Sequence, residues 1–178
     1  MEIVEKALRI AAVAHKEQLR KSDQSPYIVH PIMVARILAE HGFDDTVQAA
    51  ALVHDVIEDT AVTEDQLRAE LGDEIVDIVV AVSEDKNLEW EARKEAYIEA
   101  VVNASEAVKA VSVTDKIHNA QSLIHHHSLV GEAAWCVYSR PREQKLWFEQ
   151  TLHDRLKEVW QHPLLGEYSN LVKKLQEL

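Results

Sequence analysis

Histidine and aspartate, residue types that bind metals and transfer protons, occur here in an ordered set: His30, the adjacent pair His54-Asp55, and Asp115. The pair stands in an otherwise apolar stretch, where burying ionisable groups is costly unless something compensates their charge. A bound cation would compensate it directly. A lone His-Asp pair more often forms a local hydrogen bond, but the ordered set of four is a stronger indication of a functional site.

Two acids, Glu58 and Asp59, follow the His-Asp pair. On a continuous helix, Glu58 would share a face with His54 and Asp55, because residues three and four apart lie on the same side. The alternative interpretation is that both acids mark a solvated helix end. Acids at a helix C-terminus oppose the helix dipole, and this local penalty favours a functional reason for them.

The elements that must position these residues are predicted to be helices throughout. The 178 residues include only four glycines and four prolines, and helix-favouring residues are plentiful. We expect one all-α domain over 1–178, a compact helical bundle in which the apolar helix 46–59 is central and buried. The predicted helices are 2–19, 31–40, 46–59, a short helix between Thr63 and Gly72, 73–83, 88–103, 105–126, 141–161 and 165–177.

Charge and composition narrow the class of protein. With 31 acidic and 19 basic residues the formal net charge is −12, which argues against duplex nucleic acid as the main partner. The N-terminal stretch lacks the pattern of a signal peptide, and no apolar run is long enough to span a membrane. Cys136 is the only cysteine, which fits a reducing compartment. We therefore expect a cytoplasmic protein that acts on a small molecule, with an oligomeric state that the sequence does not predict.

Several strings around these residues resemble the HD-domain phosphohydrolases, named for their His-Asp pair. The closer resemblance is to the hydrolase domain of the RelA/SpoT alarmone enzymes and their small stand-alone relatives, and it extends over about 5–125. The matching strings are Arg20-Lys21-Ser22, Tyr27-Ile28-Val29-His30-Pro31, Ala50 to Thr60, and Asp115-Lys116-Ile117-His118-Asn119. The chain after residue 128 departs most from the family pattern.

This resemblance implies an HD-type helical bundle with one metal ion bound by His30, His54, Asp55 and Asp115. The implied ion is Mn²⁺, with Fe²⁺ or Zn²⁺ as alternatives, because two imidazoles and two carboxylates suit these ions better than thiolate-loving metals. It also implies that metal-activated water attacks the 3′-diphosphate of guanosine 3′,5′-bis(diphosphate) and releases pyrophosphate. Glu58 and Asp59 would handle the proton and orient the water.

The resemblance further implies a nucleotide site. Arg20 would pack its flat guanidinium on the guanine base, with Lys21 and Ser22 near the base or its phosphates. Asn119 and Ser122 would contact the nucleotide from a later helix. Without the resemblance, Arg20-Lys21 would be interpreted as an ordinary cationic helix end.

Other polar residues are weaker candidates for the site. Lys116 is expected to point away from Asp115, Lys86 to be a surface charge, and His125-His126-His127 to be a polar helix end. Candidates for a nucleotide contact beyond residue 128 are Tyr138, Arg140 and Arg142.

Three alternatives stay open at this point. The same site could serve a phosphatase or nucleotidase for another nucleotide or a phosphorylated dinucleotide, because the walls of a pocket choose the substrate. The chain could instead be a non-catalytic nucleotide-binding module, although its intact set of candidate residues disfavours this. A purely structural metal fits poorly, because such sites are usually saturated and often rich in thiolates.

Overall fold

The computed structural model describes residues 2–178, and all regular structure within them is helical. The elements are α1 (Ile3–Ala14), α2 (Val29–Glu40), α3 (Asp45–Val53), α4 (Val56–Asp59), α5 (Glu64–Leu71), α6 (Asp73–Val82), α7 (Trp90–Asn103), α8 (Glu106–Val130), the 3-10 helix η1 (Gly131–Val137), α9 (Arg142–Val159) and α10 (Pro163–Glu177). No strand occurs among the described residues, so the predicted all-α fold is confirmed. No helix in this range is both long and apolar enough to cross a membrane.

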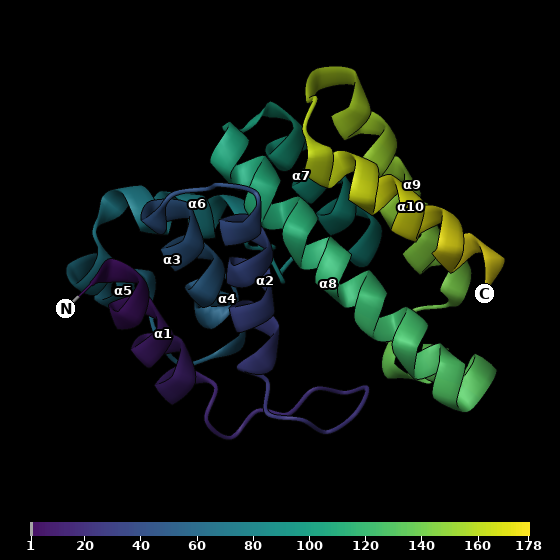
Figure 1. Cartoon of the computed structure of the whole chain (residues 1–178), viewed down its shortest axis with the longest axis horizontal. Helices are drawn as coiled ribbons and strands as arrows, with labels where there is room; N and C mark the ends of the chain where they lie inside the picture. Colours follow the sequence, from purple (N-terminus) through teal and green to yellow (C-terminus); the bar gives the residue numbers. More distant parts are fainter. Residues whose placement is uncertain (1) are drawn as a thin grey trace.

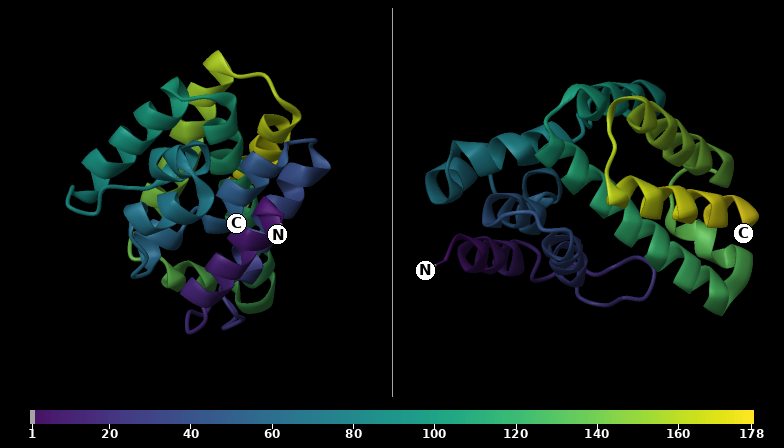
Figure 2. Two further views of the ribbon diagram at one scale, coloured as in Figure 1. Left: turned by 90° about the vertical axis from the view of Figure 1, so that its left-hand side faces the viewer. Right: turned by 45° about the horizontal axis from the view of Figure 1, so that its top comes forward.

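The long helix α8 runs through the middle of the molecule (Figure 1). Helices α1 to α6 lie on one side of it, and α9 and α10 lie on the other, with the chain termini at opposite ends (Figures 1 and 2). Helix α8 packs against α2, α3 and α6 from the first group and against α10 and η1 from the second. Residues from both halves of the chain therefore meet along this one helix.

The apolar centre of α3 is buried as predicted. Ala49, Ala50, Ala51 and Val53 have no exposed surface, and Leu52 is almost fully covered. Asp44 begins the helix, because its side chain accepts a hydrogen bond from the Val47 amide. Thr63 and Gln66 form the predicted capping box at the start of α5.

The predicted continuous helix 46–59 is wrong in one respect that matters for the site. The helix stops at Val53 and restarts as the single turn Val56–Asp59, so the His54-Asp55 pair lies at the break between α3 and α4. Successive residues of a regular helix point about 100° apart. At this break the two side chains nevertheless meet, with His54 Nε2 3.1 Å from Asp55 Oδ2.

The predicted helix 2–19 is also too long, because α1 ends at Ala14. The following segment folds into an irregular loop whose two arms pair with each other. The Arg20 amide donates to the Ser25 carbonyl, the Tyr27 amide donates to the Gln18 carbonyl, and Leu19 and Pro26 form an isolated antiparallel bridge. These contacts between arms override the helical preference of Lys16 to Gln18.

A smaller apolar cluster anchors the C-terminal part of the chain to α8. Its buried members are Ala120 and Leu123 of α8, Ala134 and Trp135 of η1, and Leu175 of α10. Tyr138 packs against the edge of this cluster. Helix α8 extends to Val130, beyond the predicted end at 126, and ends at Gly131, whose φ of 62° suits glycine.

Candidate active site

His30, His54 and Asp115 converge from three helices that are distant in the sequence. His30 lies in the first turn of α2, His54 follows the last residue of α3, and Asp115 lies in the middle of α8. One donor atom from each lies within 4.8 Å of the others, and all three residues are buried. His30 Nε2 is 2.9 Å from Asp115 Oδ1, and His54 Nε2 is 3.7 Å from the same oxygen.

Asp55 completes this arrangement as its fourth member. Its Oδ2 lies 3.1 Å from His54 Nε2 and 3.7 Å from His30 Nε2. The Tyr27 hydroxyl donates a hydrogen bond of 2.5 Å to the same Oδ2 and thereby fixes the carboxylate. The four residues assigned to a metal in the sequence analysis are therefore brought together in the structure.

The chemistry of this cluster suits a cation. The His54 Nδ1 atom lies 2.7 Å from the Ala51 carbonyl oxygen, which can only accept, so the proton of a neutral ring is on Nδ1. The buried Nε2 atom then offers a lone pair toward the other three residues and has no hydrogen-bond partner of its own. Such an orphaned buried nitrogen beside two carboxylates fits a metal ion.

The electrostatics lead to the same conclusion. Burial alone would lower the pKa of His54, but the Asp55 and Asp115 carboxylates outweigh it and hold that pKa well above its ordinary value. Burial would raise the pKa of Asp115, but Lys116 and the two histidines lower it well below its usual range. The centre therefore favours a positive charge.

Asp115 is held by two neighbours on α8. Asn119 Nδ2 donates to Asp115 Oδ1 over 2.6 Å, and Lys116 Nζ contacts Asp115 Oδ2 at 2.7 Å. The expectation that Lys116 points away from Asp115 is wrong. Its long side chain folds back because the carboxylate supplies the compensating charge that a buried ammonium needs. The Lys116 ammonium also lies 4.9 Å from the Tyr97 ring centre.

A small cavity of about 120 Å³ borders the cluster on one side. Its polar wall consists of His54, Asp55, Glu58, Glu84, Tyr97, Ser112, Asp115 and Lys116. Glu58 Oε2 accepts a 3.2 Å hydrogen bond from the Glu84 amide. Burial raises the pKa of Glu58, so its carboxyl group is better able to hold a proton than an exposed glutamate.

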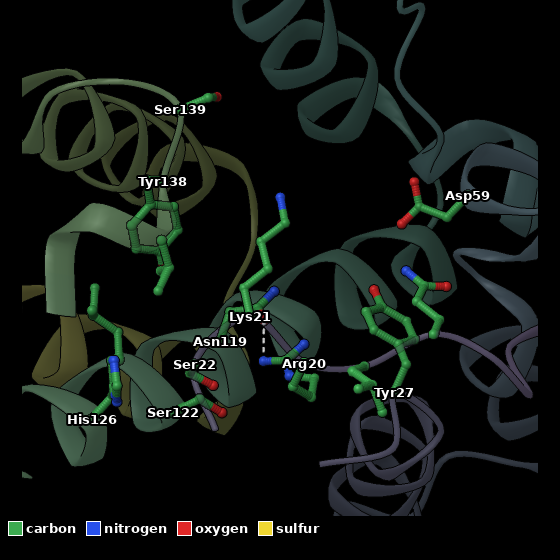
Figure 3. Close-up of a pocket in the computed structure, with 14 residues that line it drawn as sticks. Arg20, Lys21, Ser22, Tyr27, Asp59, Asn119, Ser122, His126, Tyr138 and Ser139 are labelled. Atoms are coloured by element: carbon green, nitrogen blue, oxygen red, sulfur yellow. Dashed lines mark hydrogen bonds between the residues drawn. The ribbon is translucent and has the colours of Figure 1, made fainter. Parts of the chain in front are cut away.

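A larger cavity of about 420 Å³ is lined by all five residues that the sequence analysis assigned to the nucleotide. The loop after α1 contributes Arg20, Lys21 and Ser22, and α8 contributes Asn119 and Ser122. Figure 3 shows Tyr138 and His126 on one side of this cavity and Tyr27 and Asp59 on the other. Segments from the beginning, middle and end of the chain thus form its walls.

The large cavity is linked to the His-Asp cluster by a short chain of hydrogen bonds. Arg20 Nη2 donates to Asn119 Oδ1 over 3.0 Å, shown as the dashed line in Figure 3, and Asn119 in turn donates to Asp115. The Arg20 guanidinium also lies 5.7 Å from the Tyr27 ring centre.

Glu58 and Asp59 face different cavities. Glu58 lines the small one, and Asp59 lines the large one. Lys86 contacts both residues, because its ammonium donates to the Glu58 carbonyl at 2.8 Å and to Asp59 Oδ1 at 2.9 Å. Lys86 is exposed, as predicted for a surface charge, but it also pairs with Asp59, and no local signal could have revealed a contact across 27 residues.

Only some of the other residues considered in the sequence line the large cavity. Tyr138 lines the large cavity, whereas Arg140 lies near the Trp90 ring and Arg142 near Glu132, and neither lines it. Of the three consecutive histidines, only His126 lines it. All three lie in the last two turns of α8, and His127 lies in its last turn, so the prediction of a polar helix end is close.

Comparisons with known proteins agree with this geometry. A family model described as HD domain matches residues 7–135. A guanosine-3′,5′-bis(diphosphate) 3′-pyrophosphohydrolase MESH1 of Xenopus tropicalis is 38% identical over 124 residues, which cover 68% of this chain and 69% of the relative.

A guanosine-3′,5′-bis(diphosphate) 3′-pyrophosphohydrolase of Haemophilus influenzae is 39% identical over 120 residues, which cover 64% of this chain. The matched region spans only 18% of that much longer relative. A solved structure, described as a metazoan ortholog of SpoT that hydrolyzes ppGpp, superposes with a TM-score of 0.83 at 27% identity. That match covers 100% of this chain and 98% of the other.

Proposed function

The chain belongs to the HD-domain family, and from this we propose that it is a metal-dependent phosphohydrolase that removes the 3′-diphosphate of guanosine 3′,5′-bis(diphosphate). One observation carries the choice of a nucleotide substrate. A cavity lined by Arg20, Lys21, Ser22, Asn119 and Ser122 opens next to the cluster of His30, His54, Asp55 and Asp115. A nucleotide in that cavity could place a phosphate at the cluster.

His30, His54, Asp55 and Asp115 would hold the metal. We propose Mn²⁺, with Fe²⁺ or Zn²⁺ as alternatives, because the donor set combines nitrogen and oxygen and lacks sulfur. When bound, such an ion polarises a phosphoryl oxygen and lowers the pKa of water. The fixed ring orientation of His54 and the anchored carboxylates of Asp55 and Asp115 support this assignment.

Glu58 would accept a proton from the attacking water. Its carboxyl group lies in the wall of the small cavity with His54 and Asp55, and the Glu84 amide fixes one of its oxygens. A raised pKa suits this role, because a general base works best when its pKa approaches the working pH. The other oxygen, Oε1, lies 3.5 Å from the Lys86 ammonium and would take the proton.

Asp59 would help to orient the water from the side of the large cavity, where its carboxylate is exposed to a bound ligand. Lys86 holds Asp59 Oδ1 and supplies a positive charge at this edge. This charge reduces the repulsion between Asp59 and a phosphorylated substrate.

The walls of the large cavity suit a nucleoside. The Arg20 guanidinium plane can stack on a guanine base, and Lys21 carries a positive charge suited to phosphates. Ser22, Asn119 and Ser122 supply donors and acceptors for the base and the sugar. The Tyr138 ring, which enters the cavity from the η1–α9 connection, offers a second flat surface. We further propose that the protein works in the cytoplasm.

The deciding experiment is a turnover screen of the purified chain with Mn²⁺. Guanosine 3′,5′-bis(diphosphate) is compared with other nucleotides and NADPH, and pyrophosphate and orthophosphate are measured separately. We expect pyrophosphate from the alarmone alone, and none from a Glu58→Gln variant that still binds Mn²⁺. Orthophosphate from another nucleotide would overturn the substrate but keep the hydrolase. Release of neither, with Mn²⁺ bound, would overturn the proposal in favour of a binding module.

A further inference from the structure

His118 contacts His30 from behind the His-Asp cluster. The two Nδ1 atoms are 2.7 Å apart, and the ring centres are 4.9 Å apart at an interplanar angle of 37°. His118 lies on α8, three residues after Asp115, and is half-buried. It lines neither cavity, so it is positioned to act on His30 rather than on a substrate.

The two nitrogens of His30 face different partners. Nε2 lies 2.9 Å from Asp115 Oδ1, on the side where the cluster converges, and Nδ1 faces His118. A nitrogen that binds a cation must present its lone pair, and a neutral imidazole carries one proton. With a cation on Nε2, that proton is therefore on Nδ1, where His118 Nδ1 must accept it.

His54 has a matching arrangement that supports this interpretation. Its Nδ1 donates to the Ala51 carbonyl, so its Nε2 is the nitrogen that faces the cluster. Each candidate histidine ligand thus has one partner that fixes its outer nitrogen. For His54 the partner is backbone, but for His30 it is a side chain that mutation can change.

We propose that His118 is a positioning residue that holds His30 in the tautomer and ring orientation needed to bind the metal. This inference rests on the metal site of the proposed function but not on the identity of the substrate. Outer partners of metal-binding histidines typically change metal affinity by about 10- to 100-fold when mutated. We expect a loss in that range when the acceptor at the Nδ1 position is removed.

Three substitutions separate hydrogen bonding from packing. His118→Asn keeps an acceptor oxygen near the position of Nδ1, His118→Gln moves it outward, and His118→Leu removes it. His125→Leu is the matched control, because His125 is an exposed histidine of the same helix. Unfolding temperatures of the metal-free variants show whether each one folds.

Isothermal titration with Mn²⁺ alone gives the first readout. We expect His118→Leu and His118→Gln to weaken binding by about 10- to 100-fold, His118→Asn to restore most of the affinity, and His125→Leu to match the wild type. Equal affinity of wild type and His118→Leu would overturn the proposal, as would a loss in His118→Asn as large as that in His118→Leu.

A second readout uses the unmutated protein and does not depend on any variant folding. Long-range ¹H–¹⁵N NMR of the ¹⁵N-histidine-labelled, Zn²⁺-loaded chain reports which ring nitrogens carry protons. We expect a proton on His30 Nδ1 and on His118 Nε2. A proton on His118 Nδ1 would overturn the proposal. Neither readout involves the alarmone, so a failure of the proposed substrate would leave both intact.

Discussion

His54 uses its two ring nitrogens for different purposes. Nδ1 is bonded to the Ala51 carbonyl, and Nε2 is buried without a hydrogen-bond partner among charged neighbours. A buried polar atom without a partner costs on the order of 1–3 kcal/mol, which a bound cation would recover. Because Nδ1 is held by the Ala51 carbonyl, Nε2 points into the cluster, where an arriving cation would replace the proton that the Asp55 and Asp115 carboxylates favour.

Removing a proposed ligand should remove the metal. We predict that His54→Ala and Asp55→Ala each lose measurable Mn²⁺ binding and turnover, because each takes one donor from a set of four. Metal content by atomic emission and pyrophosphate release check this together. A variant that loses its metal but keeps its rate would contradict the mechanism.

Glu58 should affect the rate and leave the metal in place. We predict that Glu58→Gln lowers kcat by about 10²- to 10⁴-fold, the usual contribution of a general base, with Mn²⁺ affinity nearly unchanged. Steady-state kinetics and metal titration separate the two effects. Full activity in this variant would refute the assigned role.

The pH profile offers an independent check on Glu58. Burial raises its pKa, and a base must be deprotonated to act, so kcat should fall with decreasing pH at values above those typical of an exposed glutamate. The residual rate of Glu58→Gln should lack this acid limb. The same limb in both proteins would assign it to another group.

Arg20 should act on the nucleotide more than on the metal. We predict that Arg20→Ala raises KM by about 10-fold or more, because a stacking guanidinium is lost from the large cavity. Mn²⁺ affinity should change less. Arg36→Ala is a suitable control, since Arg36 is exposed and paired with Glu40 within α2. An unchanged KM would show that the assigned base contact is wrong.

At the scale of elements, the side chains that cap helix N-termini contribute to the free energy of unfolding. We predict that Asp44→Ala lowers the free energy of unfolding by about 1 kcal/mol, because the cap on the Val47 amide is lost. Asp45→Ala is the control, since Asp45 follows in the same first turn without forming the cap. Urea unfolding measures both, and equal losses would mean that the cap contributes little.

Most helices could be predicted from the sequence, because their apolar spacing and caps are local. The capping box at Thr63 and the stop at Gly72 are examples. The break at His54 could not be predicted, since Ala49 to Val53 and Val56 to Asp59 favour helix equally well. At the break, both members of the pair contact residues far away in the sequence, His54 with Asp115 and Asp55 with Tyr27.

In the candidate site, too, local sequence strings could be recognised, whereas contacts that depend on tertiary packing could not. The residues proposed to bind the metal and the nucleotide could be picked out because they stand in specific strings, and the structure brings each set together. Lys86 and His118 were missed as contacts. Their partners, Asp59 and His30, are 27 and 88 residues away in the sequence, and only tertiary packing connects them.

At the scale of the molecule, α8 joins the two halves of the site. Its Asp115 faces the cluster shared with α2 and α3, and its Leu123 belongs to the apolar cluster that carries η1 and α10. Tyr138 packs on that cluster and lines the large cavity. The C-terminal part of the chain therefore helps to shape the large cavity.

The C-terminal cluster should contribute substantially to stability. We predict that Leu175→Ala lowers the free energy of unfolding by about 2–5 kcal/mol, because Leu175 is fully buried in it. Leu129→Ala, at an exposed position of α8, should change it by no more than about 0.5 kcal/mol. Denaturant titration compares the two, and similar effects would mean that the cluster is not well packed.

The hydrogen-bonded path from Arg20 through Asn119 to Asp115 has a thermodynamic consequence. A base that draws Arg20 toward itself changes the partner that orients Asn119, and with it the carboxylate proposed to hold the ion. Occupancy of the two sites is then coupled, and such coupling is reciprocal. Whatever factor the ion adds to nucleotide affinity, the nucleotide must add to ion affinity. The two affinities must therefore change together, and the free energy of coupling has the same value whichever ligand binds first.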